Sequence, residues 1–211
     1  MTGRPTLIGL ATATTGAVTV LNGTPAGSPG ALDRIAFVAQ DAPLYANLPV
    51  AGMLHVARNL NRRWDQQRAQ ARLAELDIPL KKKVGQLSCG QKAQLALTVA
   101  LARRPDLLVL DEPLAALDPL ARHDFMQSVM ATVAADGISV VLSSHMVADL
   151  ERVASYLIVL SFGQVTVAGE VGDLVAANNA GLEEIVLASM RESGKEVPSR
   201  GARPSDQLSS H

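Results

Sequence analysis

The segment 107–113, Leu-Leu-Val-Leu-Asp-Glu-Pro, constrains the fold more than any other part of the chain. Four consecutive aliphatic residues without polar alternation are typical of a strand that is buried on both faces of a parallel sheet. Asp111 and Glu112 follow this strand directly, and open α/β sheets place their ligands at that end. One carboxylate can hold a hydrated Mg²⁺ while the next orients an attacking water. The alternative is a strand followed by two solvated acids in a loop.

Strand-like and helix-like segments alternate along the rest of the chain. The predicted strands are 17–21, 34–39, 107–110 and 138–142, with a late hairpin formed by 156–161 and 164–168. The predicted helices are two within 50–77, split near Trp64, and one each over 88–103, 119–135 and 182–190. This order predicts an α/β fold with a mainly parallel sheet flanked by helices, in which residues of about 48–103 contribute a small helical lobe. Residues 138–142 also lack a polar face, so we expect this strand to be buried on both sides.

Composition excludes several classes of protein. Hydrophobic residues make up 48% and charged residues 18%, which is typical of a globular chain. The net charge of −1 provides no basic field for a nucleic-acid partner, and one cysteine excludes an internal disulfide. There is neither an apolar run of ~18 residues nor a secretory leader, so a cytoplasmic protein is expected. Residues 1–192 are expected to form one domain, followed by a disordered, polar tail over 193–211.

A second polar motif occupies residues 87–91, Leu-Ser-Cys-Gly-Gln, immediately before a helix rich in Ala and Leu. Ser88 is a good helix N-cap, and Gly90 would let an anion approach the first turn. The backbone N–H groups and the helix dipole at this end favour phosphate. The alternative is an ordinary capped helix.

Single polar residues follow other predicted strands. His145 ends the strand 138–142 in the sequence Ser-Ser-His, and Gln40 ends the strand 34–39. Asp118 follows the acidic pair by six residues and precedes a proline. Alone, a histidine in this place is more often structural than catalytic, and a glutamine after a strand carries little information.

Taken in order, Gln40, the segment 87–91, the segment 107–113, Asp118 and His145 resemble an ATP-binding-cassette (ABC) ATPase domain. In that family the corresponding elements are the Q-loop, the signature, Walker B, the D-loop and the switch histidine. The resemblance covers about residues 7–170 and implies a P-loop NTPase-like fold that uses ATP and Mg²⁺.

The resemblance implies a role for each matching residue. Asp111 would hold Mg²⁺ together with Gln40, which senses the metal and the γ-phosphate. Glu112 would act as general base toward the hydrolytic water. His145 would contact the γ-phosphate and that water.

The signature residues would act across a dimer. Ser88, Gly90 and Gln91 would reach the nucleotide held by an opposing ATPase subunit, and Asp118 would help to couple the two sites. Cys89 departs from the glycine that the family usually has there, which puts the close backbone approach at this position in doubt.

The glycine-rich phosphate loop, G-x-x-x-x-G-K-[ST], does not occur in the 211 residues. Only Lys195 of the five lysines follows a glycine, and Glu196 comes after it. Residues 6–10 resemble the end of the helix that follows this loop, so the chain is expected to lack the Walker A region. Three explanations are open: a misassigned start or a shortened form of a longer protein, a shortened paralogue, or a decaying gene product. The abrupt junction beside intact site residues favours the first.

The resemblance implies an ATP hydrolase that drives a transporter, with a separate membrane permease and a second ABC ATPase subunit as partners. Residues 169–174 and 182–190 resemble export-type ATPases of the multidrug or antibiotic-resistance kind, so export is expected, at the inner face of the cell membrane. A packing helix is the alternative for the second segment. Without the phosphate loop, the isolated chain is expected to bind ATP weakly and to be inactive. The alternative function is a non-catalytic partner that donates only its signature face to a complete ATPase subunit.

Overall fold

A computed structural model describes residues 13–40 and 43–195 of the chain. The chain divides into two compact units, Met1–Asp149 and Leu150–His211, and each is described by itself. The segment 6–10 and the part of the expected tail from residue 196 onward lie outside the described residues.

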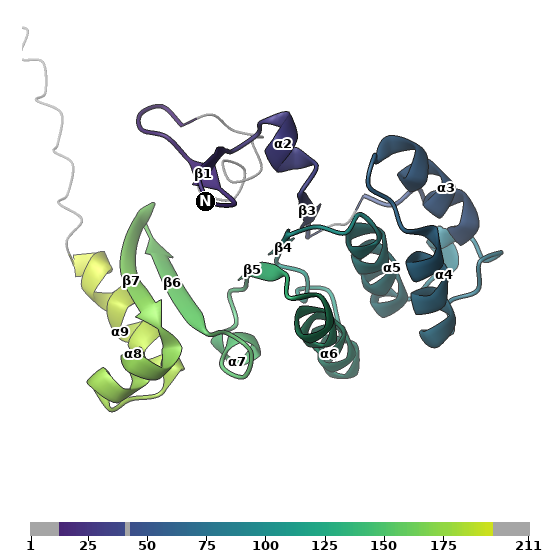
Figure 1. Ribbon diagram of the computed structural model, residues 1–211. Helices are drawn as coiled ribbons and strands as arrows, with labels where there is room; N and C mark the ends of the chain where they lie inside the picture. Colours follow the sequence, from purple (N-terminus) through teal and green to yellow (C-terminus); the bar gives the residue numbers. More distant parts are fainter. Residues whose placement is uncertain (1–12, 41–42, 196–211) are drawn as a thin grey trace, which may run out of the picture. The chain divides into compact units, whose positions relative to one another are not determined.

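The first unit is built on three parallel strands in the order β3–β4–β5 (Figure 1). Their bounds are Ile35–Val38 for β3, Leu107–Asp111 for β4 and Ser139–Ser143 for β5. Val38 lies opposite Leu110, and Asp111 lies opposite Ser143. The predicted parallel sheet is thereby confirmed, and the carboxyl ends of its strands meet at one edge.

Helices connect these strands, as parallel pairing requires. Between β3 and β4 lie α3 (Val50–Leu60), α4 (Gln66–Glu75), the short 3₁₀ helix η1 (Val84–Gln86) and α5 (Cys89–Ala102). Helix α6 (Pro119–Asp136) connects β4 to β5, and α7 (Val147–Leu150) follows β5. Each helix that was predicted in this region is confirmed, including the division of 50–77 into two.

A small hairpin of β1 (Thr19–Val20) and β2 (Thr24–Pro25) precedes the sheet, followed by α2 (Pro29–Leu32). Leu21, Asn22 and Gly23 turn the chain with φ of 49°, 62° and 95°. An Asn-Gly pair adopts such left-handed angles readily, which explains why the predicted strand 17–21 ends here.

Apolar residues of β4 alternate between two clusters. Leu108 and Leu110 pack with Leu97 and Phe125 from α5 and α6, while Val109 packs on the opposite face with Val20 and Ile35. Strand β4 is therefore buried on both faces, as predicted. Burial of each such side chain contributes roughly 1.5–3 kcal/mol relative to its exposure.

Helix α5 joins the helical lobe to the sheet. Its Leu97 and Leu101 contribute to the cluster over β4, and its Leu95 and Ala102 contribute to a second cluster with Leu54 and Leu73 of α3 and α4. A helix that is apolar on more than one side is typically buried between elements, which is the place that α5 occupies.

The prediction that β5 is buried on both sides is wrong. Val140 and Leu142 pack against the cluster over β4, but Val141, on the other face, is 42% exposed. The strand lies at the end of the β3–β4–β5 order, and within the described residues the cluster that covers Val109 does not extend to Val141. The apolar composition of β5 was therefore not sufficient to predict its burial on both faces.

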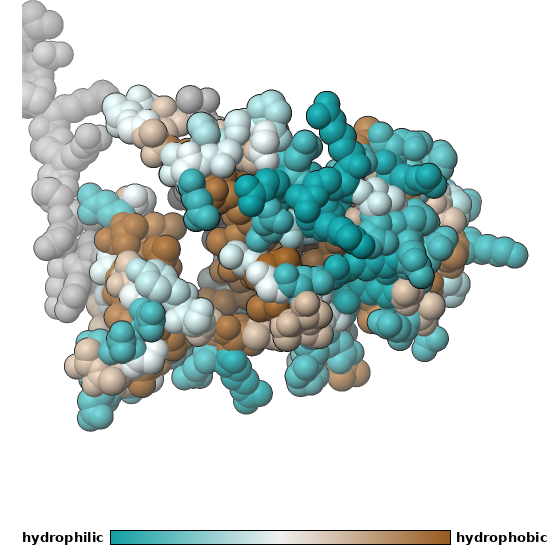
Figure 2. Space-filling view, viewed as in Figure 1, coloured by the Kyte–Doolittle hydropathy of each residue, from teal (hydrophilic) through white to brown (hydrophobic). Residues whose placement is uncertain are grey.

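The second unit consists of a hairpin and two helices. Strands β6 (Tyr156–Ser161) and β7 (Gln164–Glu170) pair antiparallel around Phe162 and Gly163, as predicted, and α8 (Val171–Asn178) and α9 (Leu182–Lys195) follow. Leu157 and Val159 are buried, as are Leu182, Ile185 and Val186 of α9. The alternate residues Tyr156, Ile158 and Leu160 are exposed, and Figure 2 shows hydrophobic side chains gathered over this hairpin.

Helix α9 reaches three residues into the predicted tail, since it ends at Lys195. Among the described residues, none of the helices combines the length and the apolar character that crossing a bilayer would need.

A cluster of charges ties the start of α4 to the end of α5. Asp65 caps α4 by accepting the backbone N–H of Arg68 at 2.9 Å, and it also accepts Nη2 and Nε of Arg104 at 2.5 and 3.0 Å. The backbone N–H of Asp65 donates to the carbonyl of Ala102 at 2.7 Å. The Arg68 N–H first and the Arg104 guanidinium second hold the pKa of the Asp65 carboxyl below its usual value.

We expect Asp65→Asn to lower the stability of the first unit in a pH-dependent manner, because asparagine can still cap α4 but carries no charge. A carboxyl whose pKa is lowered on folding stabilises fully above its unfolded pKa of about 3.9, and this contribution is lost as the pH falls through the folded pKa. Urea unfolding, followed by the fluorescence of Trp64, should therefore show a gap between variant and wild type at pH 6 that narrows toward pH 3.

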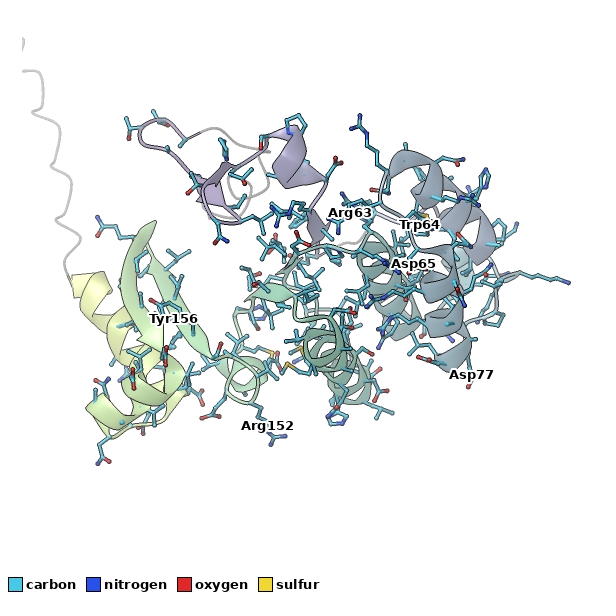
Figure 3. The ribbon with its side chains drawn as sticks, viewed as in Figure 1. Arg63, Trp64, Asp65, Asp77, Arg152 and Tyr156 are labelled. Carbon is cyan, nitrogen blue, oxygen red and sulfur yellow. The ribbon has the colours of Figure 1, made fainter. Side chains whose placement is uncertain are left out.

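Asp77→Asn is the matched control, because Asp77 is exposed just beyond the other end of α4 (Figure 3). A gap for Asp65→Asn that stays constant between the two pH values would contradict the assigned role of the Asp65 charge.

Candidate functional site

Asp111 and Glu112 lie at the carboxyl end of β4, and a serine on the neighbouring strand holds both. The Ser143 hydroxyl lies 3.0 Å from Oδ1 of Asp111, to which it donates, and it accepts the backbone N–H of Glu112 at 2.9 Å. The register that places Asp111 opposite Ser143 brings these groups together. One hydroxyl therefore orients a carboxylate and fixes the peptide of the next residue.

Glu112 turns sharply out of the strand, with a φ of +47°. This left-handed conformation is uncommon outside glycine, so the neighbouring contacts must maintain it. The turn brings Oε2 of Glu112 to 2.7 Å from Nδ1 of His145, which follows β5. The side chain of Glu112 is 15% exposed and that of His145 is 67% exposed, so the pair has a partly buried acid and an accessible imidazole.

Gln40 lies at the same edge of the sheet. It comes two residues after Val38, the last residue of β3, and its side chain is exposed. Because Val38 pairs with Leu110, Gln40 follows β3 at the level where Glu112 follows β4. The structure thus brings Asp111, Glu112 and His145 into one cluster, with Gln40 on the adjacent strand end.

The predicted signature residues lie at the amino end of α5. Ser88 caps the helix by accepting the backbone N–H of Gln91 at 3.1 Å, while Oε1 of Gln91 accepts the N–H of Ser88 at 3.3 Å. This reciprocal capping box fixes both side chains. Cys89 is exposed at the first position of the helix.

Close packing against α6 favours glycine at position 90. A Cβ added there would lie 3.0 Å from the Cβ of Ala121, in the first turn of α6. Asp118 caps that turn by accepting the N–H of Ala121 at 3.0 Å. The starts of α5 and α6 therefore lie against each other, and this contact brings Asp118 and the predicted signature residues into the same region.

Arg122 links the start of α6 to the segment after β5. Its Nε donates to the carbonyl of Leu117 at 2.9 Å, and its Nη1 lies 2.9 Å from Sδ of Met146 and 3.8 Å from a carboxylate oxygen of Asp149. The residue thus connects the loop that carries Asp118 with the residue after His145.

Ser143 and Arg122 were not singled out by sequence reasoning. Ser143 could have been found from the parallel pairing, because the residue level with Asp111 on the next strand is a hydroxyl donor. No sequence signal indicates Arg122, since its partners Leu117 and Met146 come from two different loops.

Asp111 offers the type of ligand that Mg²⁺ prefers, a carboxylate oxygen oriented by a second hydrogen bond. The described residues contain no group of three or more His, Cys, Asp or Glu side chains arranged to hold a metal. A Mg²⁺ ion beside Asp111 would complete its coordination with water or phosphate oxygens.

Comparison with known proteins supplies a family. A family model described as "ABC transporter" matches residues 5–115. A solved structure described as the ATP binding subunit of an ABC transporter superposes with a TM-score of 0.75 at 24% identity, covering 88% of this chain and 81% of that one. CbiO1 from Clostridium perfringens, part of the ABC transporter complex CbiONQ, superposes with a TM-score of 0.69 at 22% identity, covering 91% and 80%. These likenesses confirm the predicted fold class.

Curated relatives are ATP-binding proteins. The ABC transporter ATP-binding protein YtrB of Bacillus subtilis is 31% identical over 60% of this chain and 44% of its own length. The thiamine import ATP-binding protein ThiQ of Shigella sonnei is 27% identical over 82% of this chain and 79% of its own length. The molybdenum import ATP-binding protein ModC of Brucella melitensis is 33% identical over 74% of this chain and 46% of its own length. The chain spans about half the length of two of these relatives, YtrB and ModC. Two of the three act in import, so the predicted export direction finds no support here.

We expect Gly90→Val to destabilise the first unit by about 1–3 kcal/mol, because the added methyl groups overpack the contact with Ala121. Adding Ala121→Gly should restore part of the loss, since it removes the Cβ on the opposite side of the contact. Urea unfolding of the two single variants and the double variant measures the coupling.

Gly30→Val serves as the control, because a Cβ at Gly30 meets open space, and its effect should stay within about 0.5 kcal/mol. Additive effects of Gly90→Val and Ala121→Gly would show that this contact does not constrain the glycine.

Proposed function

This chain belongs to the ABC transporter family, and we propose that it is an ATP-binding subunit that couples ATP binding and hydrolysis to transport through a separate membrane permease. The observation that carries the proposal is the meeting of Asp111, Glu112 and His145 at one edge of the sheet. The import proteins ThiQ and ModC support a role in transport. Export remains a prediction from the sequence, and the proposal is for transport without a stated direction.

Glu112 is the proposed general base. Its carboxylate would take a proton from the water that attacks the γ-phosphate, and the contact at 2.7 Å with His145 holds it in one orientation. Because Nδ1 of His145 faces Glu112, Nε2 is the imidazole atom that would meet the γ-phosphate. The exposure of the His145 ring suits contact with a ligand that arrives from solvent.

Asp111 and Gln40 would hold Mg²⁺. The bound cation would neutralise charge on the phosphate oxygens. Ser143 supports this role by fixing one oxygen of Asp111.

Ser88, Gly90 and Gln91 would contact the nucleotide of an opposing ATPase subunit, with Asp118 beside them. The Ser88 oxygen accepts a hydrogen bond as the helix cap, so its hydroxyl proton can donate to a phosphate oxygen. The adjoining starts of α5 and α6 present two helix amino ends, which favour anions. The relative CbiO1 is itself part of a multi-subunit complex.

We also propose that the 211-residue chain binds ATP weakly by itself and acts at the cytoplasmic face of the membrane in a complex. No G-x-x-x-x-G-K-[ST] loop occurs in its sequence, and each charge-assisted hydrogen bond to phosphate contributes about 1.5–3 kcal/mol.

A second candidate function is that of a non-catalytic cassette that donates its signature face to a complete ATPase subunit. The capping box of Ser88 and Gln91, which fixes both side chains at the amino end of α5, supports it. In this case, Ser88→Ala should lower ATP hydrolysis by the complex with a complete partner, whereas Glu112→Gln should leave it unchanged.

We expect calorimetry to detect no micromolar binding of MgATP to the purified 211-residue chain, because the main phosphate contacts are missing. ThiQ, titrated in the same buffer, is the positive control. A saturable heat signal with a micromolar Kd for the chain would contradict the proposed weak binding.

The role of Glu112 in ATP hydrolysis is tested in a chimera. A strand and a Gly-x-x-x-x-Gly-Lys-Thr loop from an ABC ATPase are joined to the amino terminus of the chain. We expect this chimera to hydrolyse ATP, and Glu112→Gln to lower its kcat by roughly 10²–10⁴-fold while ATP binding is retained. Glu75→Gln, a change of the same kind on an exposed residue of α4, should leave kcat unaltered.

Cooperative thermal melting of the chimera establishes that it folds before activity is judged. A folded, active chimera whose kcat does not respond to Glu112→Gln would exclude Glu112 as the base.

A further inference from the structure

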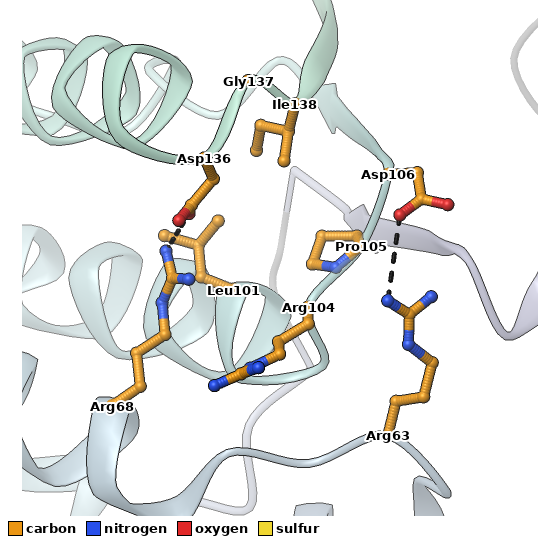
Figure 4. Close-up of a pocket in the computed structure, with 9 residues that line it drawn as sticks. All are labelled: Arg63, Arg68, Leu101, Arg104, Pro105, Asp106, Asp136, Gly137 and Ile138. Atoms are coloured by element: carbon orange, nitrogen blue, oxygen red, sulfur yellow. Dashed lines mark hydrogen bonds and ion pairs between the residues drawn. The ribbon is translucent and has the colours of Figure 1, made fainter.

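A hollow of about 510 Å³ lies at the amino-terminal edge of the sheet, opposite the strand ends that carry the candidate site (Figure 4). Three connections of the first unit line it: the one from α3 to α4 with the start of α4, the one from α5 to β4, and the one from α6 to β5. Asp106 immediately precedes β4, and Ile138 immediately precedes β5. The hollow is therefore separate from Asp111, Glu112 and His145.

Arginines dominate the charge of this hollow, which we call the arginine pocket. Arg63, Arg68 and Arg104 line it, together with Asp106 and Asp136. Two further charges pair with the lining from outside: Arg34 with Asp106, and Asp65 with Arg104. Four guanidinium groups thus face three carboxylates, which leaves a net charge of +1 among the residues that form these pairs.

Arg63 is the least engaged of these cations. Its Nη2 lies 3.8 Å from Oδ1 of Asp106, whose other oxygen, Oδ2, is in closer contact with Nε of Arg34. At 3.8 Å the Arg63–Asp106 pair is longer than a hydrogen bond, and the Arg63 side chain is 42% exposed. A guanidinium has five N–H donors, so Arg63 can engage a ligand without breaking a hydrogen bond given by the described residues.

Arg68 and Arg104 each have a guanidinium nitrogen that their ion pairs do not use. Arg68 pairs with Asp136 through Nη2, and Arg104 uses Nε and Nη2 on Asp65, which leaves Nη1 in both cases. Figure 4 shows the three arginine side chains together with the apolar side chains of Leu101, Pro105 and Ile138, which also line the hollow. An apolar wall beside a charged contact strengthens the electrostatic attraction.

We propose that the arginine pocket binds a small soluble molecule with a phosphate-type dianionic group, held by Arg63 and by the remaining donors of Arg68 and Arg104. Guanidinium groups match the geometry of phosphate oxygens, and a hollow of this volume is within the usual range of small-molecule sites. Its recessed form favours a soluble ligand over the flat array of phosphates on a lipid surface.

Such a ligand would bridge the helical lobe and the sheet. Arg63 and Arg68 belong to the lobe, whereas Asp106 and Asp136 flank the strands. The pairs Arg68–Asp136 and Arg63–Asp106 already cross this boundary. The alternative is that these pairs only latch the lobe in place and leave no capacity for a ligand.

The test is titration of the full chain with pyrophosphate at constant ionic strength, set with chloride. We expect saturable binding with one site per chain in calorimetry, and shifts of the Arg63 and Arg104 Nε–Hε signals in ¹H–¹⁵N spectra. These side-chain signals distinguish the arginine pocket from the nucleotide site at the other edge. Arg63→Ala should weaken binding by roughly tenfold, the loss expected for one charge-assisted hydrogen bond.

Arg152→Ala is the matched control, since it removes the same charge from an exposed position in the second unit and should leave pyrophosphate binding unchanged. Arg63→Lys, which keeps the charge but loses the planar fork, should fall between wild type and Arg63→Ala. Thermal melting of each variant establishes that it is folded.

Three outcomes would overturn the proposal. One is the absence of saturable pyrophosphate binding, and another is an equal loss of that binding in Arg63→Ala and Arg152→Ala. Either result would mean that the arginine pairs only hold the helical lobe against the sheet. Binding to phosphatidylglycerol vesicles that depends on Arg63, without binding of pyrophosphate, would identify a membrane phosphate as the ligand and exclude the soluble one.

Discussion

The parallel pairing of β4 with β3 on one side and β5 on the other is the interaction on which the candidate site depends. It sets Asp111 level with Ser143 and brings Gln40, Glu112 and His145 to the same edge. The alternating burial of Leu108, Val109 and Leu110 maintains this register, because a slip of one residue would turn each side chain to the wrong face. The same burial that stabilises the sheet therefore positions its polar groups.

Helix α5 connects the other parts of the ABC domain to this sheet. Its apolar residues belong both to the cluster over β4 and to the cluster of the lobe, and its amino end carries Ser88, Gly90 and Gln91. The close contact of Gly90 with Ala121 then brings the start of α6 alongside. A single buried helix thus links the lobe, the predicted signature residues and the loop of Asp118, and at its other end it contributes to the arginine pocket.

Sequence patterns predicted the elements well because each element carries its own periodicity. The aliphatic run before Asp111, the helical spacing within 50–77 and the turn at Phe162 and Gly163 are local signals, and the structure has the corresponding elements. The exposure of Val141 could not be predicted in this way, because burial at a sheet edge depends on neighbours in space. The turn at Glu112 could not be predicted from the sequence either, because glutamate has no intrinsic preference for a positive φ.

Some of the polar contacts could be predicted from the sequence, and others could not. The acidic pair and the histidine follow strands directly, so parallel pairing alone predicts that they approach each other. Ser143, Arg122 and the arginine pocket depend on which loops face one another, and residues as far apart in sequence as Arg63 and Asp136 share one hollow. Recognition of the ABC family pointed to the first group only.

The turn at Glu112 has a consequence for how such a chain can change over evolutionary time. Its backbone N–H is held by the hydroxyl of Ser143, a contact that does not involve the carboxylate. Replacement of Glu112 by another residue would therefore remove the proposed base while the turn keeps its main support, and glycine would even relax the left-handed angle. The carboxylate and the backbone turn thus depend on different atoms at this position, so the side chain can change while the turn keeps its hydrogen bond to Ser143.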